Sequence, residues 1–219
     1  MSVNLNHPRA RKSRLAVAFK PVMFVFRLIR IVSILGGVSL LIIENPVGWL
    51  VLVFAPVVFL LEKWWEGELH RLSPISGSSQ AEDLLASNIL GQFNSEITSE
   101  KIAHAVVKSS GGQFIAGRFG LGATTIESLA TIPQNSPEKI FETAIEIHRK
   151  LNTTTVSGSV LTLAIIRNYP DFEKLLAQFH LDFEDLERGV EWHDHIFSLI
   201  NKSKTPIKDG GLARDWSFG

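Results

Sequence analysis

The stretch RLIRIVSILGGVSLLIIENPVGWLVLVFAPVVFLLEKWW, residues 27–65, decides the fold of the first third of this chain. A single helix over residues 31–61 would be about 46 Å long, whereas the hydrocarbon layer of a bilayer is only about 30 Å thick. That helix would also hold Glu44 and Pro46 at mid-bilayer, and an interior proline alone costs about 3 kcal/mol. A turn over Glu44–Gly48 avoids both costs. The sequence therefore predicts a transmembrane helical hairpin.

The first leg of the hairpin is expected over residues 22–43, and a shorter second leg, which Pro56 can kink, over residues 47–61. Arg27 and Arg30 lie one turn apart near the start of the first leg, where they can snorkel to lipid headgroups. A hairpin that re-enters without crossing, and a buried hairpin of a soluble protein, are the alternatives. The expected membrane anchors are Arg27, Arg30 and three interfacial tryptophans, Trp49, Trp64 and Trp65.

The distribution of charge predicts how the chain is oriented. Residues 1–30 contain seven lysines and arginines and no acidic residue. Basic segments stay on the cytoplasmic side, and a hairpin returns the chain to the side from which it entered. We therefore expect a protein of the cell membrane with its N-terminus and its soluble domain in the cytoplasm. The basic tail suits an anionic lipid surface as its partner, not nucleic acid, because no basic helix with interleaved aromatic residues accompanies it.

The soluble part is predicted to be all-α. Helix-start signals recur after residue 80, and no segment shows a sustained alternation of apolar and polar residues. Starts are expected at Ala81, for a helix over residues 81–93, and near Thr98, Thr124, Pro137 and Asp182. The expected organisation is a basic tail (1–20), the hairpin (21–65), a linker (66–80), a helical domain (81–202) and a second linker (203–219).

The helical domain contains a weak internal repeat of about 60 residues. KIAHAVVK, FIAGRFGL and TTIESL are followed by the similar segments VLTLAIIR, EKLLAQFHL and FEDLERGV. Phe119 aligns with Phe179, and Leu121 aligns with Leu181. The apolar positions match while the polar ones do not, which is typical of a duplicated helical unit whose core is retained.

The sequence contains no pattern for catalysis, a cofactor or a metal ion. Residues 111–125, GGQFIAGRFGLGATT, have the glycine spacing of a phosphate loop, but Arg118 and Phe119 stand where such a loop needs Lys and Ser or Thr. His193 and His195 would point to different faces of a helix, so a metal site is not expected, and His193 falls on the apolar stripe. The chain has no cysteine, which excludes disulfides.

The duplicated unit resembles the Clp N-terminal domain, the double-repeat module at the front of Clp-type AAA+ unfoldases. The second repeat carries the resemblance best, through ETAIEIHRKLNTTTVSGSVLTLAIIRN and FEKLLAQFHLDFEDLERGV, and the first matches through DLLASNILGQF, SEKIAHAVVK and FIAGRFGL. The similarity covers residues 81–202. The final segment KTPIKDGGLARDWSFG resembles the linker that leads into the first ATPase module of membrane-attached Clp-like proteins.

The resemblance implies a function in protein quality control. It implies a domain that binds unfolded proteins or adaptor proteins, and a longer AAA+ ATPase that would deliver them to a ClpP-like protease. This chain has no Walker A motif, so it is not expected to be an enzyme itself. Some members of the family bind phosphoarginine through a glutamate at the start of the apolar helix of each repeat. Glu100 stands at that position in the first repeat, but Ser159 replaces it in the second.

Two other functions are compatible with the sequence. The hairpin and basic tail could form a membrane-structural or scaffolding protein that shapes the bilayer, an activity that would survive deletion of residues 81–202. An enzyme is the weakest hypothesis, because no constellation of acid, base and nucleophile stands out.

Overall fold

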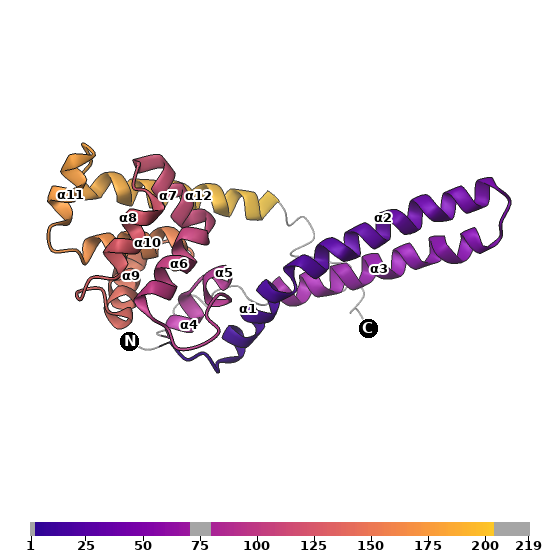
Figure 1. The fold of residues 1–219 in the computed structure, drawn as a ribbon, viewed down its shortest axis with the longest axis horizontal. Helices are drawn as coiled ribbons and strands as arrows, with labels where there is room; N and C mark the ends of the chain where they lie inside the picture. The colour runs from indigo at the N-terminus through magenta and orange to yellow at the C-terminus, as the bar shows by residue number, and fades with distance from the viewer. Residues whose placement is uncertain (1–2, 71–79, 204–219) are drawn as a thin grey trace. The chain divides into compact units, whose positions relative to one another are not determined.

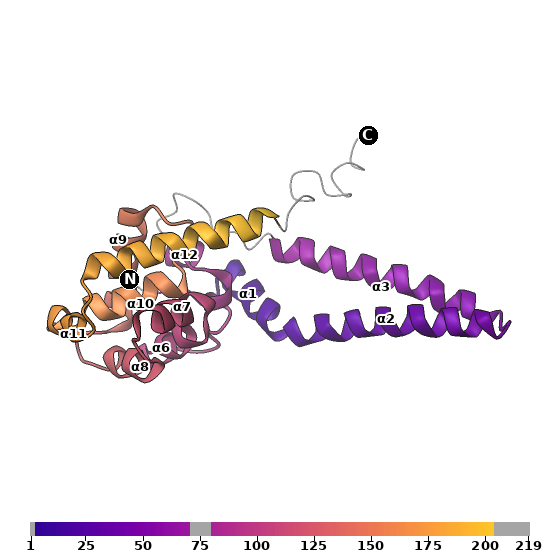
Figure 2. The same cartoon turned by 90° about the horizontal axis from the view of Figure 1, so that it is seen from above.

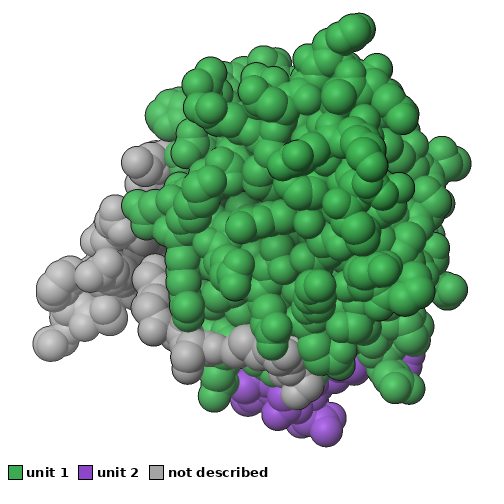
Figure 3. All heavy atoms as spheres, turned by 90° about the vertical axis from the view of Figure 1, so that its left-hand side faces the viewer, with its two compact units in different colours: residues 1–3, 74–89, 96–219 green, residues 4–73, 90–95 purple. Residues whose placement is uncertain are grey.

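The computed structural model describes residues 3–70 and 80–203, and the named secondary-structure elements in these ranges are all helices (Figure 1). The expected linker over residues 66–80 and the segment 203–219 lie largely outside these ranges. The chain divides into two compact units, coloured separately in Figure 3. One contains residues 4–73 and 90–95, and the other, which includes the helical bundle, contains residues 1–3, 74–89 and 96–219. The all-α prediction is confirmed for the described residues.

The first unit is built on the predicted helical hairpin. Helices α2 (Lys20–Ile42) and α3 (Val47–His70) lie side by side in Figures 1 and 2. At about 1.5 Å per residue, each is roughly 35 Å long, so the second leg is longer than expected. The connection contains Glu44, whose positive φ of 58° allows the tight reversal. Helix α1 (Pro8–Ala18) precedes the hairpin, so the basic tail is largely helical.

Both hairpin helices are long and apolar enough to cross a membrane. Only 11% of the apolar window in α2 and 22% of that in α3 is buried, so this hairpin is not covered by a protein core within the described residues. Exposed Leu35, Ile42 and Leu50 are typical of this surface. Glycines bring the helices together near the turn, since a Cβ placed on Gly37 would lie 2.7 Å from Leu52 and 3.1 Å from the carbonyl oxygen of Gly48. The hairpin therefore packs along its own seam and presents apolar side chains outward.

The bundle contains nine helices in the described part of the chain, and α10 lies at its centre. Every residue of α10 from Gly158 to Ile166 is buried, and this helix packs against α6, α7, α8, α9 and α12. The bounds are α4 (Ala81–Leu84), α5 (Ser87–Leu90), α6 (Ser99–Lys108), α7 (Ser110–Phe119), α8 (Ala123–Ala130), α9 (Pro137–Leu151), α10 (Gly158–Arg167), α11 (Phe172–Gln178) and α12 (Phe183–Ser203).

Side-chain caps begin three of these helices where the sequence predicted a start. The Thr98 and Ser136 hydroxyls accept hydrogen bonds from the backbone nitrogens of Lys101 and Lys139, both at 3.3 Å. Asp182 accepts from the Asp185 nitrogen at 2.8 Å, and Asp185 accepts in return from the Asp182 nitrogen at 3.1 Å. This reciprocal pair is a capping box that opens α12.

Two local predictions differ from the structure. The helix expected over residues 81–93 is divided into α4 and α5, because Leu85 is extended and forms a parallel bridge with Val156. The Ala86 nitrogen donates to the Val156 carbonyl at 3.0 Å, and the Val156 nitrogen donates to the Leu84 carbonyl at 2.9 Å. Near Thr124, the helix begins at Ala123 with Gly122 as its cap, so the threonine lies inside the helix.

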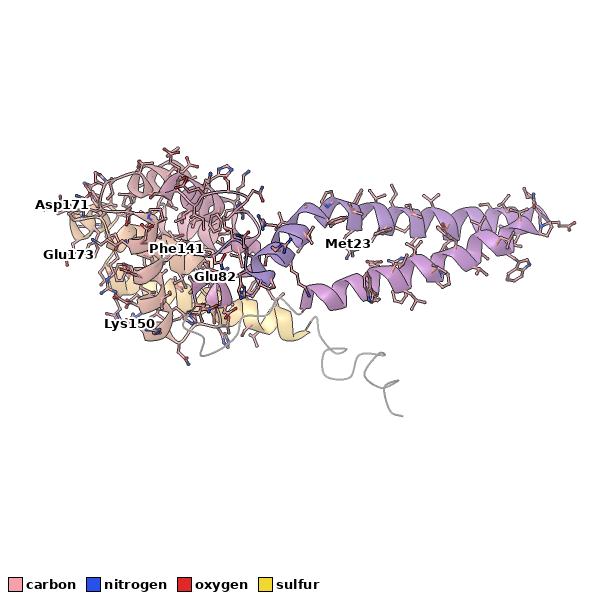
Figure 4. The ribbon with its side chains drawn as sticks, turned by 90° about the horizontal axis from the view of Figure 1, so that it is seen from below. Met23, Glu82, Phe141, Lys150, Asp171 and Glu173 are labelled. Atoms are coloured by element: carbon pink, nitrogen blue, oxygen red, sulfur yellow. The ribbon has the colours of Figure 1, made fainter. Side chains whose placement is uncertain are left out.

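Polar contacts tie α12 to the end of α9. Lys150, labelled in Figure 4, donates to both carboxylate oxygens of the buried Glu187 at 2.6 Å. Asp194 accepts hydrogen bonds from the Thr154 hydroxyl at 2.8 Å and from the Thr154 nitrogen at 3.2 Å. The loop between α9 and α10 is therefore fixed against α12.

Candidate functional site

The predicted binding residue Glu100 lines a surface groove between α6 and α8. Glu100 is the second residue of α6, where a carboxylate also interacts favourably with the helix dipole. The groove has a volume of about 430 Å³. Its lining consists of Glu100, Lys101, Ala103, His104, Glu127 and Thr131.

The groove carries opposite charges in a defined arrangement. Glu100 from α6 and Glu127 from α8 supply two exposed carboxylates, while the Lys101 ammonium donates to the carbonyl oxygen of Glu96 at 2.7 Å. His104 lies one turn along α6 from Glu100 and lines the same groove. The two acids therefore give the groove the capacity to hold a cationic side chain.

Buried Asn135 fixes the two helices that form the groove. Its side-chain amide donates to the carbonyl oxygens of Leu129 at 2.7 Å and of Ile165 at 3.0 Å. The Ser99 hydroxyl donates to the Asn135 carbonyl oxygen. Since Leu129 lies in the last turn of α8 and Ser99 begins α6, one residue holds both walls of the groove in place.

Ser159, the position that the predicted repeat aligns with Glu100, has a different environment. It is fully buried, and its hydroxyl shares a hydrogen bond of 2.7 Å with Ser157. A Cβ placed on Gly111 would lie 2.7 Å from the Ser159 backbone nitrogen, so α7 approaches α10 closely here. This packing excludes a glutamate side chain at the second position, and the described bundle presents one such acid rather than two.

The residues predicted to anchor the hairpin are placed as follows. Trp49 and Trp64 are exposed, at 64% and 63%, and the side chain of Trp65 lies outside the described part of the structure. Arg27 Nε donates to one carboxylate oxygen of Glu62 at 2.8 Å, and Arg30 donates to the other at 2.7 Å. The sequence interpretation missed Glu62 as the partner of both arginines.

A cluster of aromatic rings lies where α7 meets α12. Phe114 stacks on Trp192 with ring centroids 5.2 Å apart, and His193 lies at 5.2 Å from Phe114 and 6.0 Å from Phe197. Burial lowers the pKa of His193, against the opposing effect of the Asp194 carboxylate. His193 is thus a half-buried residue at the rim of the core. No group of three or more potential ligands that could hold a metal ion occurs in the described ranges.

Comparison with protein-family models found no match for this chain, and comparisons with curated proteins and with solved structures found none either. The resemblance to the Clp N-terminal domain therefore rests on the sequence segments quoted above.

Proposed function

We propose that this chain is a membrane-anchored module that binds unfolded or adaptor proteins on behalf of a Clp-type ATP-dependent unfoldase. The hairpin is the anchor, and the bundle is the binding domain. Apolar helices that could cross a membrane by length and composition support the first part. The ATPase and a ClpP-like protease would be partners or further parts outside residues 1–219.

The observation that carries the proposal is a repeated helix ending in the bundle. Gly120, at the end of α7, and His180, after α11, both have positive φ values, 68° and 56°. Each lies three residues before the start of the next helix, at Ala123 and at Phe183. For the non-glycine residue His180 this conformation costs about 1 kcal/mol. We therefore attribute it to a backbone conformation that the two segments have in common, and not to coincidence. It supports a unit duplicated at about 60 residues.

The order of helices supports the same interpretation. Helices α6, α7 and α8 occur in the same order as α10, α11 and α12, and α6 and α10 each have ten residues. Glu100 and Ser159 are each the second residue of their helix. Glu100 is exposed whereas Ser159 is buried, so the groove beside Glu100, between α6 and α8, is the proposed binding site.

The chemistry of the groove suggests which segments it would bind. Two carboxylates favour a client segment that carries a basic side chain, and phosphoarginine is a second ligand because Lys101 and His104 stand beside the acids. A membrane anchor raises the effective concentration of the groove near clients at the bilayer surface. The module would therefore act on proteins that expose unfolded segments close to the membrane.

Binding of an unfolded protein by groove variants tests the proposal. The full chain in lipid nanodiscs is titrated with fluorescent casein, with and without arginine phosphorylation. Glu100→Gln and Glu127→Gln should each weaken binding at least fivefold, because each removes one of the two carboxylates. Glu173→Gln is the matched control, since this exposed glutamate lies on α11 (Figure 4), outside the groove lining.

Equal binding by Glu100→Gln and Glu173→Gln would exclude the groove as the binding site. No binding of either casein by the unmodified chain would refute the chaperone function. If the full chain reshapes vesicles while binding no client, the membrane-scaffolding alternative is favoured instead.

A further inference from the structure

The C-terminal half of α12 exposes a group of large apolar side chains. Four of them are each between 43% and 50% exposed, and in the described part of the bundle Phe179 is the one other large apolar side chain that is exposed. Adjoining exposed apolar side chains of this kind mark an interaction site on a protein surface. We call the four residues the α12 face: Trp192, Phe197, Leu199 and Ile200.

The α12 face continues the stripe by which this helix packs in the bundle. Leu186 and Val190, near the start of α12, are buried, whereas Phe197 and Ile200 on the same stripe are exposed. Figures 1 and 2 show the C-terminal end of α12 extending past α7. A helical stripe with apolar residues at steps of three and four is the surface on which a second helix packs. The α12 face therefore fits a helical partner.

Arg118 of α7 adds a positive charge at the edge of the α12 face. Its guanidinium carbon lies 5.4 Å from the centroid of the Trp192 ring and 5.9 Å from that of the Phe119 ring. Ring contacts hold a guanidinium group in place but do not satisfy its five N–H donors. Within the described part of the chain, these ring contacts are the interactions of the Arg118 guanidinium.

The acids of α12 beside Trp192 do not pair with Arg118. Asp194 accepts hydrogen bonds from Thr154 instead, and Glu191 forms no ion pair with Arg118 among the described residues. Arg118 is exposed, so its donors can be reached from outside the bundle. The guanidinium group is therefore positioned to bind a carboxylate of another molecule.

We propose that the α12 face and Arg118 form a docking site for an amphipathic helix of another protein, with an aspartate or glutamate beside the apolar stripe of that helix. The stripe would cover Trp192, Leu199 and Ile200, and the carboxylate would accept two parallel hydrogen bonds from Arg118. Charge favours such a partner over a second copy of α12, because residues 195–204 contain two lysines and no acidic residue. The described lining of the groove between α6 and α8 includes no residue of α7 or α12, so this site is separate from the groove.

Binding of designed peptides by the full chain in phosphatidylcholine nanodiscs tests the docking site. The probe is a fluorescent peptide of about 20 residues, long enough to be helical, with leucines on one face and two glutamates beside them. Its twin has glutamine in place of both glutamates, and binding to empty nanodiscs is subtracted. The unmodified chain should bind the glutamate peptide at least fivefold more tightly than the glutamine twin. Arg118→Gln should reduce this preference to below twofold. Leu199→Gln should weaken the binding of both peptides at least threefold, because it removes apolar surface and leaves Arg118 in place.

Arg167→Gln is the matched control and should keep the preference. It removes another exposed arginine that lies over an aromatic ring, at 5.9 Å from the centroid of Phe183. The proposal is overturned if the unmodified chain shows no preference, if Arg118→Gln keeps it, or if Leu199→Gln binds both peptides as the unmodified chain does.

Two further measurements identify a different occupant of the α12 face, and either result would overturn the proposal. A dimer of the full chain that Leu199→Gln dissociates in analytical ultracentrifugation would identify a second copy. Loss of peptide binding in nanodiscs that contain phosphatidylglycerol would identify anionic lipid. Casein binding is measured on the same samples. Loss of casein binding with the peptide preference intact refutes the groove alone, and the reverse result refutes this site alone.

Discussion

Replacing Asn135 by alanine should destabilise the bundle, because this buried side chain joins helices α8 and α10. Its amide group donates to the carbonyl oxygens of Leu129 and Ile165, which lie in the last turns of α8 and α10 and have no partner within their own helices. In Asn135→Ala both carbonyl groups stay buried without this donor. The variant tests whether polar contacts, and not apolar packing alone, hold the α8 wall of the groove against α10.

The expected loss of stability follows from the number of broken hydrogen bonds. Leaving one buried polar group without a partner costs about 1–3 kcal/mol, and the variant leaves two. The Asn135 amide oxygen is itself buried without a hydrogen-bond partner, so its removal recovers part of that cost, about 1 kcal/mol. The free energy of unfolding of the bundle should therefore fall by about 1–5 kcal/mol, with a midpoint of about 3 kcal/mol, against the 5–15 kcal/mol typical of a domain.

Hydrogen exchange in α10 measures this loss without interference from the hairpin. Amides of this buried helix exchange through global opening, and about 1.4 kcal/mol corresponds to a tenfold change. Exchange over residues 158–167 in Asn135→Ala, measured in detergent micelles at one pH, should therefore be at least about fivefold faster, and roughly 100-fold faster at the midpoint of the expected loss. Gln134→Ala, an exposed neighbour, should leave exchange unchanged. An Asn135→Ala rate within threefold of the unmodified chain, or an equal effect of Gln134→Ala, would refute this account of the amide.

Two further predictions concern packing and pH. Gly111→Ala should lower the free energy of unfolding by about 1–3 kcal/mol, because its Cβ would lie 2.7 Å from the Ser159 nitrogen. The Cβ of Gly117→Ala, in the same helix, meets no atom within 4 Å, so this variant should raise the free energy of unfolding by about 0.5–1 kcal/mol. Urea unfolding of both variants gives the sign of each change, and the same sign for both would contradict the packing. Burial lowers the pKa of His148 and of His193 from the ordinary 6.5. Below pH 6.5 the unfolded chain therefore binds more protons than the folded chain does. The free energy of unfolding should be at its full value above pH 6.5 and should decrease as the pH falls below it. His193→Gln should reduce that loss, as measured by thermal unfolding between pH 7 and pH 5, and an unchanged pH profile would show that His193 does not contribute.

Much of the fold could be predicted because the decisive signals are local. The turn residues at 44–48 and the length of the apolar stretch identified the hairpin. Thr98, Ser136 and Asp182 marked helix starts because their side chains cap the backbone in place. These signals depend on a few neighbouring residues, so the sequence displays them directly.

The division at Leu85 could not be predicted in this way. The segment 81–93 has good helix formers, but Leu85 exchanges helical hydrogen bonds for a bridge to Val156. That partner lies about 70 residues away, and tertiary contacts of this kind override local propensity. The lining of the groove could likewise be predicted only in part. Glu100 was recognised from its position at the start of a helix, whereas Glu127 lines the same groove only because α8 packs on α6.

The partner of the hairpin arginines was within reach of the sequence. Two antiparallel helices pair residues that are symmetric about their turn. With the turn at 44–45, this symmetry pairs Arg27 with Glu62 and residue 30 with residue 59, as the ion pair and the ring contact show. It also pairs residue 37 with residue 52. The interpretation of the arginines as snorkelling residues considered each leg by itself and so overlooked their shared acid.

The bridge between Leu85 and Val156 has a consequence for folding during synthesis on the ribosome. The hairpin leaves the ribosome first, and the strand-like contact of Leu85 waits until residue 156 has followed it, several seconds later at about 5–20 residues per second. During that interval the apolar sides of α6, α7 and α8 lack α10, the helix against which they pack. A nascent chain halted shortly before Gly158 should therefore be sensitive to protease throughout the bundle, and one halted well beyond α12 should resist it.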